Sequence, residues 1–428
     1  MLEELDQTEK TKQKRTVLKR QDRLGQWQAE KEQSRLRRGV LPPTEELDAS
    51  PRIKVRPLRE SLDFSMAGVD RTLVLLLVGL TLFGVIMVTS TASYSIIRGG
   101  QEGIISFMLK QAVFAILGFA ALFFTTALDY HRLTWRLVLL AGPVVLLLNI
   151  LPRFISDPVN GAYRWIYIGS FSFQPSEIAK YYMVFLASGL LAFGLNIGWR
   201  AMLKRYVALF ISILLFVWVI AGIQSNLSTA GIMVLSSAIV MVMSAIPFLW
   251  NLVPGVAGIL AGIFLIWRTE YRMQRVFGFL DPFSDPTGNT LQVVQSLYAL
   301  SMGGLFGRGL GNSRFKAYWL PYAENDFIFA IICEELGLLG GLAVLTAMLA
   351  LVLLGFRAAR RARDAYGRLL AVGIVSVIGF QALINMAVVM GAFPVTGVPL
   401  PFISAGGTSL VMNLAAMGVV LNISRQGR

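Results

Sequence analysis

The segment 315–340 carries the residue with the clearest chemical potential, Asp326. It begins as a polar, aromatic-rich loop and becomes an apolar helix within a few residues, and Asp326 lies at the change, directly after Asn325. A carboxylate at the edge of a membrane helix is costly unless it has a function. Asp326 could serve as a general base whose partial burial raises its pKa. It could equally be a capping carboxylate stabilised by the helix dipole, and the sequence leaves both interpretations open.

Cations in the same stretch could complement a negatively charged substrate. Arg308, Arg314 and Lys316 lie in the loop before Asp326. Such side chains bind phosphate groups through charge-assisted hydrogen bonds. The alternative is a solvated loop face without a ligand. A phosphate-bearing substrate beside a carboxylate base is therefore one prediction for this region.

Two polar pairs at helical spacing add candidates for substrate contacts. Glu177 and Lys180 are three residues apart in FQPSEIAK and share one helix face. They either neutralise each other in a salt bridge or form a polar notch in a groove. Gln292 and Gln295 also share a face. Their amides either order the surrounding loop or contact the sugar or peptide amides of a substrate.

A segment rich in proline and glycine, PVTGVPLPFISAGGTSL, carries the last candidates. Non-helical backbone at membrane depth is tolerated only where protein or water covers it. We therefore expect Ser404 and Ser409 to face such a cavity. Glu334 and Glu335, two turns beyond Asp326, are expected to face the interior of the helix bundle, paired or protonated.

The composition shows what kind of scaffold must position these residues. The chain has 428 residues, of which 55% are hydrophobic and 15% charged, so it is predicted to be a polytopic membrane protein. A single cysteine, Cys333, and a single histidine, His131, exclude an intrachain disulfide, the usual zinc sites and Cys/His or Ser/His nucleophile systems. We interpret the net charge of +14 as lysine and arginine facing anionic lipid on the cytoplasmic side, not as binding of nucleic acid.

The expected fold is an all-α membrane protein with about ten transmembrane helices. Each span is judged by the roughly 20 apolar residues that a bilayer requires. They are predicted near 71–91, 107–127, 134–151, 176–195, 206–223, 229–247, 252–268, 327–355, 369–391 and 404–423. Residues 1–65 are predicted to be a hydrophilic, disordered cytoplasmic tail, and 66–425 the membrane domain.

The short loops predict the topology. Basic residues gather in the loops after the second, fourth and eighth spans and at the C-terminus, which places these loops and both termini in the cytoplasm. Three segments are then left outside: 152–175, 392–403 and 269–326. The last is a large extracellular loop between the seventh and eighth spans, and loops of that length are usually functional.

Several sequence blocks resemble one family. FQPSEIAK, DPFSDPTG, GGLFGRGLG, LPYAENDFIFAIICEELG and TGVPLPFISAGGTS look like signature blocks of the SEDS family, whose members include FtsW, RodA and SpoVE. The match covers about residues 65 to 425 and looks closer to FtsW and SpoVE than to RodA. The resemblance implies ten spans, a large extracellular loop, and peptidoglycan glycosyltransferase activity on lipid II at the cytoplasmic (plasma) membrane. It also implies a class B penicillin-binding protein and other divisome proteins as partners.

The resemblance extends to single positions. The acid of the family's D-F-I-F-A block falls on Asp326, which becomes the catalytic candidate. The family's Arg-Trp-Ile block and its Glu/Lys pair fall on Arg164, Glu177 and Lys180. With the candidates named above, the predicted substrate-binding residues are Arg164, Glu177, Lys180, Gln292, Gln295, Lys316, Asn325, Ser404 and Ser409.

The chain also departs from the family pattern. Asn226 stands where the family often has an acid, and Ala405 replaces a usual tyrosine. Glu324 stands two residues before Asp326 and could raise its pKa through like-charge repulsion. These departures suggest a divergent member.

Three hypotheses follow for function. The first is a lipid II polymerase for division or sporulation, in which Asp326 takes the proton from the attacking sugar hydroxyl and undecaprenyl pyrophosphate leaves. A divalent cation, Mg or Mn, could help to hold the pyrophosphate, although no carboxylate cluster defines a metal site. The second is a lipid II flippase or transporter, which many spans and broken helices would fit. The third is a divisome scaffold whose catalysis has lapsed.

Overall fold

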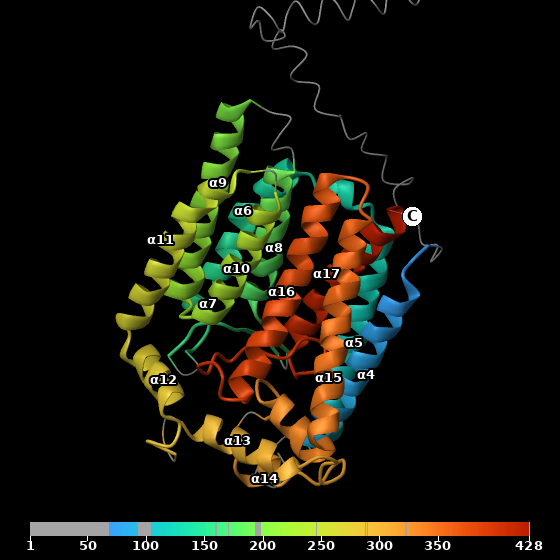
Figure 1. The fold of residues 1–428 in the computed structure, drawn as a ribbon, viewed down its shortest axis with the longest axis vertical. Helices are drawn as coiled ribbons and strands as arrows, with labels where there is room; N and C mark the ends of the chain where they lie inside the picture. Colours follow the sequence, from blue (N-terminus) through green and yellow to red (C-terminus); the bar gives the residue numbers. More distant parts are fainter. Residues whose placement is uncertain are drawn as a thin grey trace, which may run out of the picture. The chain divides into compact units, whose positions relative to one another are not determined.

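The structure is a computed structural model. It describes residues 68–92, 104–158, 161–169, 171–192, 198–244, 246–286, 288, 290–321 and 323–427. The predicted tail, residues 1–65, lies outside the described residues. In the part that is described, the chain is an antiparallel bundle of apolar helices (Figure 1).

A helix overlaps each predicted span. These helices are α4 (Arg71–Ala92), α5 (Ile104–Ala127), α6 (Trp135–Ile150), α8 (Pro175–Leu191), α9 (Trp199–Val217), α10 (Leu227–Met243), α11 (Phe248–Trp267), α15 (Ile328–Arg360), α16 (Ala365–Val389) and α17 (Gly407–Gln426). Within the described ranges, eight helices are long and apolar enough to cross a membrane. The helices α8 and α10 have 17 residues each. The multi-pass helical fold is confirmed, and the count of ten spans stays a prediction.

Shorter elements connect the long helices. These are η1 (Tyr130–Arg132), α7 (Pro152–Ile155), β1 (Ile166–Ile168), β2 (Phe171–Phe173), η2 (Trp218–Ile223), α12 (Glu270–Leu280), α13 (Leu291–Gly303) and α14 (Phe315–Tyr318). The strands β1 and β2 form an antiparallel hairpin, which the all-α prediction did not include. The segment predicted as a long loop, 269–326, contains α12, α13 and α14.

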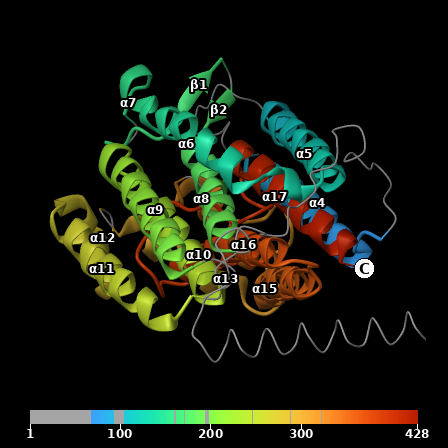
Figure 2. The same ribbon diagram turned by 90° about the horizontal axis from the view of Figure 1, so that it is seen from above.

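Small and polar residues let the outer helix α5 pack closely on α17, in the interior of the bundle (Figure 2). The Thr125 hydroxyl donates to the Ala415 carbonyl at 2.8 Å, and Thr126 donates to the Gly418 carbonyl at 3.2 Å. A Cβ on Gly418 would overlap the Leu122 backbone. Close approach of this kind is typical of helix association in membranes. The hydrophobic effect does not drive helices together in lipid, so close packing and hydrogen bonds between helices do so.

One end of the bundle gathers the short loops. The Tyr130 hydroxyl donates to Asp364 Oδ1 at 2.6 Å, and the Tyr130 amide donates to Asn422 Oδ1 at 3.3 Å. The Gln426 amide donates to Asp129 Oδ1 at 3.1 Å. The loop before α6, the start of α16 and the last turn of α17 therefore meet, as the topology predicts. The helices α12, α13 and α14 lie at the opposite end (Figure 1).

A break in α15 ties the loop after α13 to the bundle. Gly337 has φ 71° and ψ −169°, a backbone conformation that residues other than glycine rarely adopt. The break frees the carbonyls of Glu334 and Glu335, which accept from the amides of Arg308 and Gly309 at 3.0 and 2.9 Å. The α15 amides of Leu338 and Leu339 donate back to the carbonyls of Gly304 and Leu305 at 2.9 and 3.3 Å. Backbone pairing thus fixes this loop against α15.

Candidate active site

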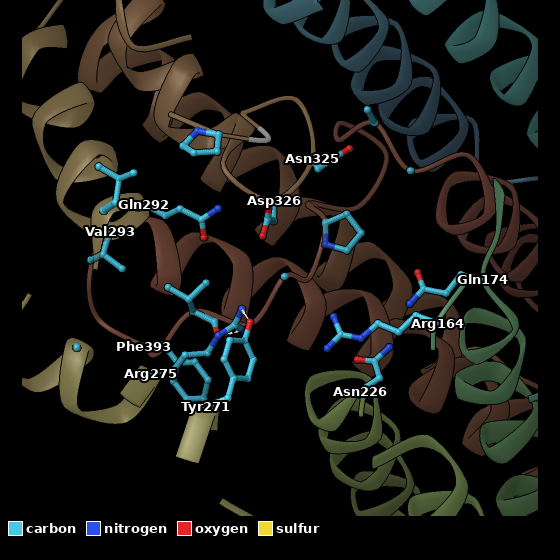
Figure 3. A pocket seen from close by; sticks show the side chains of 18 of the residues that line it. Arg164, Gln174, Asn226, Tyr271, Arg275, Gln292, Val293, Asn325, Asp326 and Phe393 are labelled. Carbon is cyan, nitrogen blue, oxygen red and sulfur yellow. Dashed lines mark hydrogen bonds between the residues drawn. The ribbon is translucent and has the colours of Figure 1, made fainter. Parts of the chain in front are cut away.

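A cavity of about 720 Å³ opens at the end of the bundle where α12 and α13 lie. Its walls come from the β-hairpin region, the start of α10, α12, α13, the segment before α15 and the loop before α17. Figure 3 shows how the polar lining residues converge. The polar and charged lining residues are Arg164, Trp165, Ser172, Gln174, Asn226, Tyr271, Gln274, Arg275, Thr290, Gln292, Asn325, Asp326 and Ser409.

The backbone of Asp326 is held from two sides. The Asn385 amide on α16 donates to the Asp326 carbonyl at 2.7 Å and to the Val398 carbonyl at 2.7 Å. Next to it, the Phe327 side chain is fully buried. The Ala405 amide donates to the Glu324 carbonyl at 2.9 Å. These contacts place the carboxylate in the cavity wall, between α16 and the loop before α17.

The Asp326 carboxylate does not cap α15. The N-cap residue is Phe327, and no side chain caps that helix. Among the described residues, no other side chain forms a hydrogen bond or ion pair with this carboxylate. Burial raises the pKa of Asp326 to about 6, to which the charge of Glu324 adds, while Arg275 and Arg164 oppose the rise. An acid with a pKa near neutrality is suited to general base catalysis.

Two guanidinium groups supply the positive charge of the cavity. Arg164 donates to the Ser225 carbonyl at 2.8 Å, and Arg275 donates to the Val395 carbonyl at 2.8 Å. Arg275 also hydrogen-bonds the Tyr271 hydroxyl and lies 4.5 Å from the centre of its ring. Burial and the neighbouring Arg275 lower the pKa of Arg164, but a guanidinium stays charged in proteins. Both side chains are therefore held as fixed cations.

Sequence reasoning did not include Arg275, Tyr271 or Gln274. All three lie on α12, at spacings of three and four residues that put them on one helix face toward the cavity. Phe277 and Leu280 on the same helix are exposed and do not line the cavity. The amphipathic pattern of residues 270–280 was the signal that could have identified them.

Half of the predicted site residues line the cavity. Arg164, Gln292, Asn325 and Ser409 join Asp326 there. The pair of Glu177 and Lys180 does not. Its atoms Lys180 Nζ and Glu177 Oε2 lie 2.9 Å apart, and both side chains are buried. This is the salt bridge that the sequence offered as the alternative to a binding notch.

The buried pair still reaches the cavity wall through one amide. Lys180 Nζ donates to Gln381 Oε1 at 2.8 Å. The other end of Gln381 donates to the Pro399 carbonyl at 3.0 Å and to Ser409 Oγ at 3.2 Å. The network therefore ties α8 and α16 to the loop that forms the wall.

The remaining predicted residues, Gln295, Lys316 and Ser404, lie away from the cavity and are buried. Lys316 Nζ pairs with Glu335 Oε1 at 2.5 Å and donates to Ser90 Oγ at 2.9 Å. Ser404 Oγ accepts from the Leu400 amide at 2.7 Å. Lys316 and Ser404 therefore have partners inside the protein and do not line the cavity, and a substrate contact by either stays a prediction.

The described residues contain no group of three or more His, Cys, Asp and Glu side chains that could hold a metal ion. Asp326 is the one acid among the described lining residues of the cavity. The protein side therefore offers a divalent cation a single carboxylate. This donor set does not fit a metal site built by the protein alone.

Comparison with known proteins identifies the family. The model of the FtsW/RodA/SpoVE family, described as "Cell cycle protein", matches residues 71–428. This chain belongs to the FtsW/RodA/SpoVE family. Stage V sporulation protein E of Bacillus subtilis is 39% identical over 362 residues, covering 84% of this chain and 98% of that protein. A probable peptidoglycan glycosyltransferase FtsW of a Geobacter species is 36% identical over 368 residues, covering 84% and 98%.

Solved structures of the FtsW/RodA/SpoVE family have the same fold. One comes from a peptidoglycan synthase complex described as coordinating polymerization and crosslinking. It matches with a TM-score of 0.68 and 26% identity over 85% of this chain and 99% of that chain. The rod shape determining protein RodA of Thermus thermophilus matches with a TM-score of 0.61 and 24% identity, covering 84% and 98%.

The structure gives a role to Asn226, the residue that departs from the family pattern. Its side chain accepts from the Thr229 amide at 3.3 Å and so caps α10. Its amide also donates to Ser176 Oγ at 3.4 Å, and the residue lines the cavity. A neutral capping amide therefore occupies the position of the missing acid, which leaves Asp326 without a second carboxylate in the described wall.

Proposed function

We propose that this chain is a peptidoglycan glycosyltransferase that polymerises lipid II into glycan strands at the outer face of the cytoplasmic membrane, in cell division or sporulation. The observation that carries the proposal is Asp326. It is the one carboxylate in the described cavity wall, its pKa is raised to about 6, and two fixed cations share the cavity with it.

Each group has a part in the transfer. Asp326 takes the proton from the 4-hydroxyl of the acceptor sugar as that oxygen attacks the anomeric carbon of the donor. The bond from the anomeric carbon to the pyrophosphate breaks, and undecaprenyl pyrophosphate leaves with inversion of configuration. Arg164 and Arg275 stabilise the charge that grows on the leaving group. Gln292 and Asn325 offer amides to the sugar hydroxyl and amide groups.

The size of the cavity suits this division of labour. Its volume of about 720 Å³ lies within the usual range of roughly 300–1,000 Å³ for small-molecule sites. It can hold the reacting sugars and the pyrophosphate, while the lipid tails remain in the bilayer.

The membrane setting belongs to the proposal as well. The short basic loops and the C-terminus gather at the end of the bundle opposite the cavity, which favours cytoplasmic termini and an external site. The peptidoglycan synthase complex that the fold resembles supports a class B penicillin-binding protein as partner. Other divisome proteins are expected partners on the same grounds.

The test is polymerisation of lipid II by purified protein, with and without the cognate penicillin-binding protein. We expect the wild type to make glycan strands and Asp326→Asn to make them about 10²–10⁴-fold more slowly. Asp157→Asn removes an exposed acid outside the cavity and serves as the matched control. Full activity of Asp326→Asn would show that another group acts as the base.

The neutral Asn226 motivates one rival, a scaffold whose catalysis has lapsed. In that case neither the wild type nor Asp326→Asn makes strands, even with the partner, while cell-wall synthesis in cells carrying Asp326→Asn remains normal. Movement of lipid II across liposomes without polymerisation would instead support a flippase.

A further inference from the structure

The last turn of α13 and the loop after it, residues 302–310, expose large apolar side chains. Phe306 is 80% exposed, Leu305 61% and Leu310 53%. A monomeric protein rarely leaves such a cluster in water without a binding function. The occupant of this surface can be argued from the depth at which the loop lies.

The depth of the loop in the bilayer can be estimated from the number of residues along α4 and along α15. Arg71 on α4 and Arg357 on α15 line one small polar pocket, which marks one boundary of the bundle. With a rise of about 1.5 Å per residue, Ser90 lies about 28 Å from Arg71, and Glu335 lies about 33 Å from Arg357. Lys316 bridges Ser90 and Glu335, so the two positions are level. The distance equals the roughly 30 Å of a hydrocarbon core, so this level marks its other boundary.

The exposed loop lies on the membrane side of that boundary. Its residues Gly304 and Leu305 pair with the amides of Leu338 and Leu339, which follow Glu335 on α15 toward the bilayer centre. Leu338 and Leu339 are themselves half-exposed, as lipid-facing residues of a span are. In Figure 1 the segment between α13 and α14 lies beside the lower end of α15. The apolar cluster is thus continuous with the lipid-facing surface of α15.

The backbone of the loop also meets the demands of lipid. Irregular backbone at membrane depth requires internal partners for its polar groups. The amides of Gly307, Arg308 and Gly309 donate to the carbonyls of Gly303, Glu334 and Glu335 at 2.8, 3.0 and 2.9 Å. Gly307 lies so close to α15 that an added Cβ would overlap the Glu335 backbone. The glycines therefore permit a pairing that removes the cost of placing this loop in lipid.

Arg308 lies next to the apolar cluster, and its backbone pairs with Glu334, close to the membrane boundary defined by Glu335. The guanidinium of Arg308 hydrogen-bonds the Met302 carbonyl at 3.3 Å and keeps partial exposure. Arginine at a membrane boundary combines a long apolar stem with a charge that attracts lipid phosphates. A loop that combines exposed apolar side chains with a cation matches a bilayer surface better than it matches the uniformly apolar face of another helix.

We propose that residues 302–310 insert Leu305, Phe306 and Leu310 into the leaflet on the cavity side and anchor the long external loop to the bilayer. The inference does not depend on the transferase activity. The anchor fixes the height of the segment that leads to Asp326, because Lys316 and Glu335 join that segment to the same level.

Site-directed spin labelling of the full chain in phosphatidylethanolamine–phosphatidylglycerol nanodiscs tests the proposal. In a Cys333→Ala background, a label is placed at Phe306→Cys. Leu342→Cys on the lipid-facing side of α15 is the lipid reference, and Ser284→Cys in the loop after α12 is the water reference. If Cys333→Ala reduces the yield, the parent chain with its buried Cys333 supplies the labelling background instead.

Relaxation of each label by dissolved oxygen and by a water-soluble nickel chelate gives the result. We expect the oxygen-to-nickel ratio at position 306 to match that at 342 and to exceed that at 284. A ratio at 306 equal to that at 284 would overturn the proposal. A label that is exposed to nickel in the protein alone and protected when a membrane partner is added would also overturn it, and would identify a protein-docking surface.

Discussion

The start of α15 has two acidic regions with opposite surroundings: Asp326, just before the helix, and the Glu334–Glu335 pair, about two turns further along. Glu335 pairs with Lys316 and accepts from Ser90. Glu334 accepts from the Ser313 hydroxyl and from the Arg314 amide, the latter at 2.8 Å. Asp326, in contrast, receives no hydrogen bond from another described side chain.

Under the proposed function, this difference distinguishes two structural acids from the proposed general base. The buried carboxylates of Glu334 and Glu335 are occupied by hydrogen-bond donors and a cation of the protein itself. A carboxylate that faces fixed cations across a cavity, without contact to them, keeps its lone pairs for a substrate. The same residue chemistry within one segment therefore serves two purposes, and substitutions can separate them.

The largest expected effect is the loss of activity at Asp326. Asp326→Asn should lower the polymerisation rate by about 10²–10⁴-fold, the usual contribution of a general base. Its melting temperature should not fall, because an acid whose pKa is raised on folding destabilises the folded state when ionised. The polymerisation assay measures the rate, and thermal unfolding of the same sample in detergent measures the melting temperature. A large drop in melting temperature would place Asp326 with the structural acids.

The buried pair should show the reverse pattern. Glu335→Gln removes the carboxylate that pairs with the buried Lys316, and removal of one partner of a buried pair typically costs about 3–5 kcal/mol. We expect a lower unfolding free energy, and unchanged activity per folded molecule at low temperature. The double variant Lys316→Met with Glu335→Gln should recover much of the stability. No recovery would argue against the pairing.

A smaller effect is expected at the break in α15. Gly337→Ala forces a side chain into a conformation that costs on the order of 1–3 kcal/mol, and its Cβ would overlap the backbone of Leu305 and Gly307. Gly258→Ala on α11 is the matched control, since nothing lies within 4 Å of an added Cβ there. Limited proteolysis of the loop after α13 should accelerate in Gly337→Ala alone. Equal proteolysis rates in Gly337→Ala and Gly258→Ala would show that the glycine at the break is not required to hold the loop against α15.

The smallest effect is a shift in the pH profile. Because the base must be ionised, polymerisation should fall as the pH drops through about 6, the raised pKa of Asp326. Glu324→Gln removes a neighbouring negative charge, which lowers that pKa and moves the acid limb to lower pH. Arg275→Gln should move it to higher pH. Initial rates between pH 5 and 8 measure the limb, and identical limbs in all three proteins would contradict the assignment of the base.

The sequence predicted the positions of the long helices because apolar length is a local property. Asp326 could be singled out for the same reason, since a charge beside an apolar run is visible without the fold. The positions of the Lys316 and Arg275 side chains in the fold could not be predicted in this way. Both are cations of the segment 269–326, but Lys316 pairs with Glu335 in the interior, whereas Arg275 lines the cavity from α12.

The break at Gly337 was also beyond sequence reasoning. Residues 328–360 read as one apolar helix, and several glycines within it look alike. Only the approach of the loop after α13 makes Gly337 different from Gly340 or Gly341. The β-hairpin at 166–173 escaped for a related reason, because three-residue strands give too short a pattern to detect.

The walls of the cavity are contributed by residues as far apart in the chain as Arg164 and Ser409. Helices enter a membrane in the order in which the ribosome makes them, so the wall that holds Ser409 arrives last. Until α17 is in place, the nascent protein carries Asp326 without the surface that encloses it. The cavity around Asp326 is therefore complete only once the last helix of the bundle has been made.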